Sequence, residues 1–105
     1  MATPTDASSL AELLAGFEVE GYRGQMAARP DGYVLCTTCH QESLAQEMQV
    51  GGLGRMEGAS DPADMLAVVA VVCPRCGTRG TLVLGYGPEA APDDADVLAR
   101  LGDVA

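Results

Sequence analysis

The stretches CTTC at residues 36–39 and CPRCG at residues 73–77 decide the fold of this chain. In each, two residues separate two cysteines, a spacing that lets one turn direct two thiolates at a single metal ion. Two such turns brought together make a closed tetrahedral site, which zinc fills most often. A closed site leaves no coordination position for a substrate or an activated water, so we expect a structural metal and no enzymatic activity. The predicted ligands are Cys36, Cys39, Cys73 and Cys76.

The length of the chain, 105 residues, suits one domain with a modest core. Aromatic residues are few, with one Phe, three Tyr and no Trp, so Leu, Val, Ala and Met must fill the interior. Zinc held by four thiolates contributes on the order of 10 kcal/mol to the folding of small units. We therefore expect one zinc ion per chain, a disordered tail over residues 1–8 and a single metal-dependent domain over residues 9–105.

The chain is strongly acidic, with a formal net charge of −9, and its six basic residues are all Arg and stand apart from one another. Binding to phosphate backbones or anionic lipid depends on clustered cations, so we expect neither a nucleic-acid partner nor a membrane partner. The sequence contains no pattern typical of a signal peptide or a membrane helix. We expect a cytoplasmic protein with reduced cysteines, and a protein partner that is basic or polar.

The N-terminal half contains the signals of a helix followed by a hairpin. SLAE at residues 9–12 has the form of a capping box, and apolar residues follow at helical spacing, which predicts a helix over about residues 9–20. Residues 23–29 suit a strand, and PDG at residues 30–32 suits a turn because Pro presets one dihedral angle and Gly accepts a positive one. The hairpin then returns through residues 33–35 into the first cysteine pair.

The C-terminal half predicts a second hairpin and a short helix. Residues 43–50 fit either a strand or a short helix, and the glycine-rich residues 51–64 suit a loop. The apolar run at 65–72 is typical of a strand covered on both faces, and 81–86 suits its partner, with the second cysteine pair at the hairpin tip. The last segment then predicts a short helix. Asp93 and Asp94 stand at its start, an apolar pattern with a late Arg follows, and a Gly ends it, so we expect the two acids to cap the helix.

The two cysteine pairs and their flanking strands, roughly residues 33–39 and 65–86, resemble the zinc-ribbon family, and CPRCG resembles the rubredoxin-type knuckle. The resemblance implies an α+β fold in which a small antiparallel sheet holds two metal knuckles, flanked here by an N-terminal and a short C-terminal helix. The chain departs from the family pattern in having His40 where the rubredoxin knuckle has Gly, and in the length of residues 40–72. Its residue usage, without any Lys, resembles that of small proteins of high-GC bacteria.

Other chemistries fit the cysteines less well. A rubredoxin-like iron centre is less favoured than zinc because the chain has few aromatic residues to surround it. CTTCH at residues 36–40 also spells a haem attachment sequence, but haem attachment requires export and leaves the second pair unexplained. A dithiol redox site needs a strand–helix context that is absent here. We expect His40 to neighbour the site without being a ligand, and GLGRMEG at residues 52–58 to be a loop without a phosphate-binding role.

Three functions are consistent with this pattern. The leading hypothesis is a non-enzymatic structural-zinc module that mediates a protein–protein interaction, as an accessory or regulatory protein. One alternative is a nucleic-acid-associated zinc ribbon of a transcription or translation factor, and a further alternative is a rubredoxin-like electron carrier. Within the predicted loop, Leu53, Arg55 and Met56 have no evident core position and are expected to contribute to the protein interface. The oligomeric state stays open.

Overall fold

The computed structural model describes residues 10–56, 65–86 and 90–101. The predicted tail, the first residue of the predicted capping box and residues 57–64 of the predicted loop lie outside these ranges. None of the helices in the described part of the chain has the length and apolar character that crossing a membrane requires.

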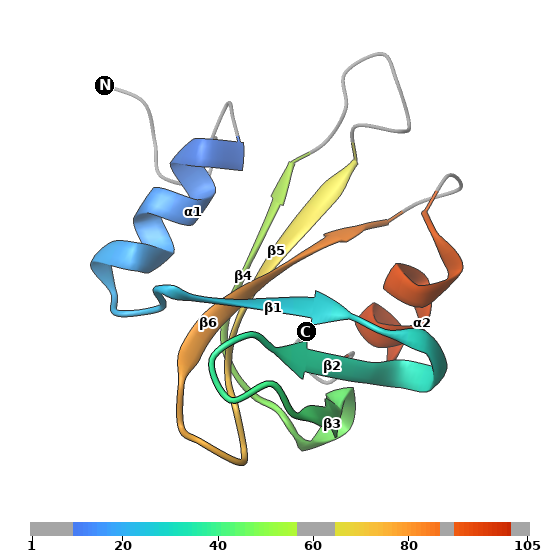
Figure 1. The fold of residues 1–105 in the computed structure, drawn as a ribbon. Helices are drawn as coiled ribbons and strands as arrows, with labels where there is room; N and C mark the ends of the chain where they lie inside the picture. Colours follow the sequence, from blue (N-terminus) through green and yellow to red (C-terminus); the bar gives the residue numbers. More distant parts are fainter. Residues whose placement is uncertain (1–9, 57–64, 87–89, 102–105) are drawn as a thin grey trace.

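The described part of the chain forms two helices and six strands (Figure 1), together with two short 3-10 turns, η1 and η2. The strands form a single sheet in the order β3-β2-β1-β6-β5-β4, in which β1 and β6 run parallel and all other neighbours run antiparallel. The predicted α+β class is confirmed, although the sheet is mixed and larger than the small antiparallel sheet that the resemblance implies. The elements in chain order are α1 (Leu10–Val19), β1 (Gly24–Ala28), η1 (Pro30–Gly32), β2 (Tyr33–Cys36), β3 (Glu42–Leu44), η2 (Ala45–Glu47), β4 (Gln49–Met56), β5 (Leu66–Val72), β6 (Arg79–Gly85) and α2 (Pro92–Arg100).

The sheet consists of two three-stranded halves, β1–β2–β3 and β4–β5–β6, which are joined by a short parallel pairing of β1 with β6. This pairing has only two registered positions, Gly24 opposite Gly80 and Gln25 opposite Thr81. A Cβ atom on Gly80 would lie 2.8 Å from the carbonyl carbon and oxygen of Gly24, so glycine is what permits the two backbones to approach. In Figure 1, β1 crosses β6 where these two strands pair.

The main core lies between these two halves and α2. From β5 and β6 it receives the fully buried side chains of Val69, Val71, Leu82 and Leu84, which share one face because opposite residues of antiparallel strands point the same way. Small aliphatic side chains therefore fill the interior, as the composition predicts. Strands β1 and β2, the η2 segment and the α2 segment complete the core with Met26, Val34, Ala45, Met48, Val97 and Leu101.

Helix α1 covers the opposite face of the sheet by packing on glycines of β4. A Cβ atom on Gly54 would meet Leu13, and a Cβ atom on Gly52 would meet Phe17, so these two side chains occupy the space that β4 leaves open. The prediction of a loop over residues 51–64 is wrong for residues 51–56, which belong to β4. Glycine lowers strand propensity, but here the pairing of β4 with β5 and the packing of α1 on the glycines outweigh that cost.

The predicted first helix, both hairpins and the C-terminal helix are present. Residues 43–50 combine both predicted options, since β3 is followed by η2 and then by the start of β4. The prediction that Asp93 and Asp94 cap α2 is wrong, because the N-cap is Ala91 and makes no side-chain capping bond. Asp94 instead accepts a hydrogen bond of 3.0 Å from the backbone N–H of Gly85, which ties α2 to the end of β6.

Candidate metal centre

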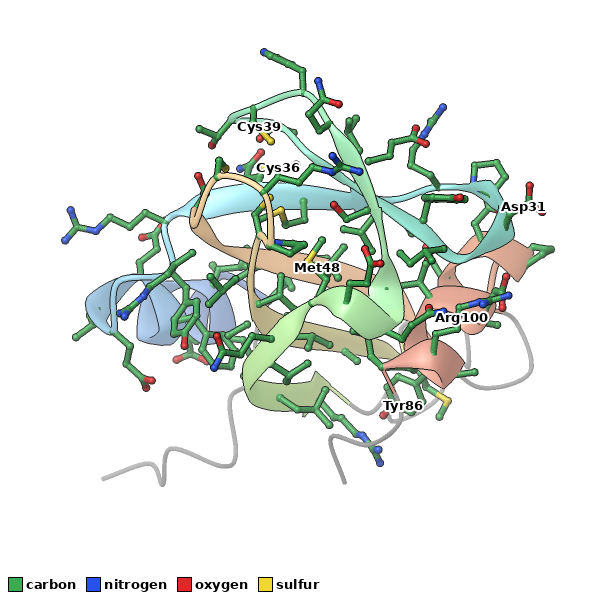
Figure 2. The ribbon with its side chains drawn as sticks, turned by 90° about the horizontal axis from the view of Figure 1, so that it is seen from below. Asp31, Cys36, Cys39, Met48, Tyr86 and Arg100 are labelled. Carbon is green, nitrogen blue, oxygen red and sulfur yellow. The ribbon has the colours of Figure 1, made fainter. Side chains whose placement is uncertain are left out.

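The two cysteine pairs lie at the tips of two hairpins, one in each half of the sheet. Cys36 is the last residue of β2, and Cys39 lies in the turn that leads to β3. Cys73 follows β5 directly, and Cys76 lies in the turn that leads to β6. We name residues 36–41 and 73–78 the first and second knuckle. Figure 2 shows Cys36 and Cys39 beside the loop that joins β5 and β6.

The structure brings the four predicted ligands together. Their Sγ atoms all lie within 4.8 Å of one another. The Sγ atoms of Cys36 and Cys76 are 3.7 Å apart, and those of Cys39 and Cys73 are 3.9 Å apart, so each of these distances joins the two knuckles. Sulfurs at the corners of a tetrahedron with Zn–S bonds of about 2.3 Å are about 3.8 Å apart. A disulfide needs about 2.0 Å, and all four cysteines are free.

The knuckles share one backbone design. In each, the N–H of the residue after the second cysteine donates to the carbonyl of the first cysteine, over 2.8 Å from His40 and 3.0 Å from Gly77. In each, the N–H of the first cysteine also donates to the carbonyl five residues later, over 3.0 Å and 2.8 Å respectively. Both turns therefore present two sulfurs on one side, as knuckle spacing predicts.

Hydrogen bonds to sulfur set the acidity of two of the thiols. The pKa of Cys76 is lowered to about 6, first because the Thr78 hydroxyl lies 3.0 Å from its Sγ and then because of the Thr78 backbone N–H. At Cys39, the Gln41 backbone N–H lowers the pKa, but burial and the three other thiols outweigh it and raise the pKa to about 11. Neighbouring thiolates repel each other, so a cation among the four sulfurs is what allows all of them to ionise.

Polar contacts tie each knuckle to a strand, the first within its own half of the sheet and the second across to the other half. The Thr37 hydroxyl donates to the carbonyl of Gln25 over 2.8 Å, which fixes the first knuckle to β1. The Arg75 Nε, in the second knuckle, donates to the carbonyl of Glu42 over 3.2 Å and to Ser43 Oγ over 3.1 Å, which fixes it to β3. Sequence reasoning missed Thr37 and Arg75, because their partners are distant in sequence and no local pattern marks them.

The four cysteines differ in their exposure to solvent. Cys36 and Cys73 are buried at the margin of the core, Cys39 is half-buried and Cys76 is exposed. His40 is exposed, and the group of potential ligands found among the described residues consists of the four cysteines without it. The arrangement suits one metal ion bound by all four sulfurs, which would link the two hairpins.

Comparison with protein-family models, with curated proteins and with solved structures finds no match to this chain. The fold and the site together define an α+β protein with a mixed six-stranded sheet and four cysteines clustered suitably for one metal ion. The function of the chain is therefore inferred from this geometry.

Proposed function

We propose that this chain is a non-enzymatic protein in which Cys36, Cys39, Cys73 and Cys76 hold one structural zinc ion, and that it acts as an accessory or regulatory protein by binding another protein. The observation that carries the proposal is the four-sulfur cluster, whose spacing matches a closed tetrahedral thiolate site. Such sites belong to structural zinc, whereas catalytic zinc keeps one position for water.

A structural role agrees with where the cluster lies. The two halves of the sheet are joined by only two registered positions of β1 and β6, and the core lies between them. A metal bound to both knuckles adds a cross-link between the halves next to that short pairing. The free energy of binding such a metal, on the order of 10 kcal/mol, is comparable to the whole stability of a small domain.

A protein partner is favoured over nucleic acid because the arginines are already engaged within the fold. The guanidinium of Arg29 pairs with Glu42, that of Arg100 pairs with Asp96, and that of Arg75 bonds to β3. Arg23 bonds to the Glu18 carbonyl, and Arg55 and Arg79 lie over the rings of Tyr86 and Tyr22. Phosphate binding needs several cations on one surface, and a chain of net charge −9 repels polyanions.

Elemental analysis of the protein purified without added metal tests the zinc assignment. We expect one zinc per chain and a colourless protein. Iron in place of zinc, with a visible thiolate-to-iron absorption band, would replace the structural role by the rubredoxin-like alternative. Affinity purification from the native cell tests the second part, since a specific protein partner is expected and a specific nucleic acid would favour the zinc-ribbon transcription or translation alternative.

A further inference from the structure

The four sulfurs of the candidate metal centre are unequally accessible to a molecule in solvent. Cys76 is exposed, whereas Cys36 and Cys73 are buried and Cys39 is half-buried. The residues directly before and after Cys76 are exposed as well, so nothing in its own turn shields it. Cys76 is therefore the sulfur that a small oxidant meets first, and oxidants select cysteines by exposure as well as by thiolate character.

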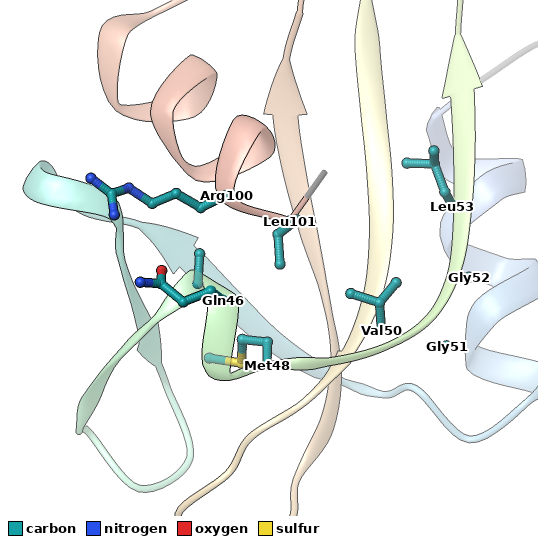
Figure 3. A pocket seen from close by; sticks show the side chains of 9 residues that line it. Gln46, Met48, Val50, Gly51, Gly52, Leu53, Arg100 and Leu101 are labelled. Atoms are coloured by element: carbon teal, nitrogen blue, oxygen red, sulfur yellow. The ribbon is translucent and has the colours of Figure 1, made fainter. Parts of the chain in front are cut away.

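The pocket of the protein does not open onto the sulfurs. Its volume is about 630 Å³, and it lies between β4, η2 and the end of α2. Figure 3 shows Met48, Val50 and Leu101 around it. None of the four cysteines is among its lining residues. A small molecule therefore reaches the cluster from the side of the knuckles, where Cys76 is exposed.

Within the cluster, Cys36 is the thiolate best placed to react with an oxidised Cys76. Their Sγ atoms are 3.7 Å apart, the shorter of the two sulfur–sulfur contacts between the knuckles. Cys73 and Cys39 each accept a backbone N–H from their own knuckle, over 3.4 Å at Cys73. Such a bond withdraws electron density from sulfur and makes it a weaker nucleophile. Access therefore decides which sulfur is oxidised, and distance and nucleophilicity decide which one follows.

The two steps balance with hydrogen peroxide as the oxidant. In the first step, the Cys76 thiolate attacks one peroxide oxygen, the O–O bond breaks and hydroxide leaves, so Cys76 becomes a sulfenic acid. In the second, the Cys36 thiolate attacks the Cys76 sulfur, the S–O bond breaks and a second hydroxide leaves, so a disulfide forms. The two sulfurs give up two electrons, which reduce the peroxide. Two thiolates remain, too few for a four-thiolate metal site.

We propose that Cys76 is an oxidation site through which hydrogen peroxide converts the metal centre into a disulfide between Cys76 and Cys36, with release of the metal. The inference rests on the proposed structural zinc site and adds a response to oxidants as the regulation of that site.

The position of the two cysteines gives the oxidised protein a distinct property. Cys36 ends β2 in one half of the sheet, and Cys76 lies in the turn before β6 in the other half. A disulfide between them therefore replaces the cross-link that the metal makes between the halves. The sulfurs must close from 3.7 Å to about 2.0 Å, and the turn of Cys76 has room to move, since a Cβ atom on Gly77 would meet no atom within 4 Å.

Peptide mapping of the wild-type protein tests the linkage. The zinc-containing protein is treated with equimolar hydrogen peroxide, then with N-ethylmaleimide, and is digested with trypsin without reductant. Trypsin cleaves after arginine, so the two cysteines of the second knuckle fall on separate peptides, residues 56–75 and 76–79, while both cysteines of the first stay on residues 24–55. We expect peptide 76–79 to be joined to peptide 24–55, with fragmentation placing the bond at Cys36. A metal-binding dye should show one zinc released per disulfide.

Urea unfolding followed by circular dichroism tests the cross-link. The oxidised, zinc-free protein should unfold at a higher urea concentration than the reduced protein stripped of zinc by a chelator. The reason is that the disulfide joins two residues that are 40 positions apart and so restricts the unfolded chain. A thiol reductant with added zinc should restore the starting protein.

Two variants locate the point of attack. Histidine is a zinc ligand, so Cys76→His and Cys39→His each keep a four-ligand site with one thiolate fewer. Cys76→His lacks the exposed thiol and should release zinc to peroxide at least about tenfold more slowly than the wild type. Cys39→His is the matched control, because it retains Cys36 and Cys76, and it should form their disulfide at close to the wild-type rate.

Several results would overturn the inference: peptide 76–79 joined to peptide 56–75, four cysteines that stay reduced, equal slowing in the two histidine variants, or an oxidised protein no more resistant to urea than the reduced, zinc-free one. These results are distinct from failure of the proposed function. A protein that contains zinc and resists peroxide keeps the proposed function and loses only this inference. A protein that contains no zinc loses the proposed function, whereas the same peptide map still decides whether Cys76 and Cys36 form a disulfide.

Discussion

His40 and Gly77 occupy the same position in the two knuckles, each directly after the second cysteine, with φ angles of 60° and 78°. Each donates its N–H to the carbonyl of the first cysteine of its knuckle. The left-handed conformation costs a non-glycine residue roughly 1–2 kcal/mol, because its Cβ crowds the neighbouring carbonyl. The first knuckle therefore carries backbone strain that the second avoids.

Substitutions at these two positions should have opposite effects. A Cβ atom at Gly77 would meet no atom within 4 Å, so Gly77→Ala changes only the backbone preference and should destabilise the metal-loaded protein by about 1 kcal/mol. His40→Gly should stabilise it by about 0.5 kcal/mol, less than the full relief because glycine has more freedom in the unfolded chain. His40→Ala should leave zinc content unchanged, since the imidazole lies outside the sulfur cluster.

Urea unfolding followed by circular dichroism measures these changes. Gly16→Ala is the matched control, because a Cβ atom there also meets no atom within 4 Å, but the residue lies in α1. It should stabilise the protein by up to about 1 kcal/mol, the difference in helix propensity between the two residues. A Gly77→Ala variant as stable as the wild type would show that the second knuckle does not require a left-handed residue.

Removal of one ligand should unfold most of the domain. Cys36 is buried and Cys76 is exposed, yet Cys36→Ser and Cys76→Ser should have similar effects because both abolish the same four-thiolate site. Circular dichroism together with zinc analysis measures the loss. Thr38→Ser, at an exposed residue between the first two ligands, is the matched control and should retain both zinc and fold. A well-folded, zinc-free Cys76→Ser protein would contradict the structural role of the metal.

The junction between the halves should be sensitive to a single methyl group. In Gly80→Ala the new Cβ would press on the backbone of Gly24, which cannot move without separating β1 from β6, so a loss of about 1–3 kcal/mol is expected. In Gly54→Ala the atom in the way is the far end of the Leu13 side chain, which can rotate, so the loss should be under about 1 kcal/mol. Thermal or urea unfolding ranks the two, and a reversed ranking would mean that the junction is not tightly packed.

Binding to duplex DNA and to RNA should be weak or absent at physiological salt, because the six arginines are dispersed and each has a partner within the fold. Electrophoretic mobility shifts at about 0.05 M and about 0.15 M salt measure this, since real phosphate contacts would give a steep salt dependence. Submicromolar, salt-sensitive binding would favour the nucleic-acid alternative.

The sequence identified the four cysteines as the candidate site because the knuckle is a local design whose spacing is visible in a few residues. It could not show that the Sγ atoms of Cys36 and Cys76 are 3.7 Å apart and those of Cys39 and Cys73 3.9 Å apart, since those distances depend on how the two hairpins meet. The hairpins and both helices follow from local periodicity and turn residues in the same way.

The errors arose where distant contacts override local preference. Gly52 and Gly54 weaken the strand pattern in the sequence. In the fold, side chains of helix α1, which is distant in sequence, pack into the space that these glycines leave free. Leu53, which had no evident core position in the sequence, packs against the core from β4, and Arg55 lies over the ring of Tyr86. Asp94 was expected to cap its own helix and instead accepts a hydrogen bond from the backbone N–H of Gly85, at the end of β6. None of these partners is adjacent in sequence.

The pairing of β1 with β6 also bears on how fast the chain can fold. Strand β1 is made early in synthesis, but its neighbour β6 and the second pair of thiolates emerge much later, and such non-local contacts form slowly. Until then, the apolar inner faces of both halves have no cover, and the exposed thiols are open to oxidation. Under the proposed function, binding of zinc to both knuckles would end the period in which these apolar faces and thiols are exposed.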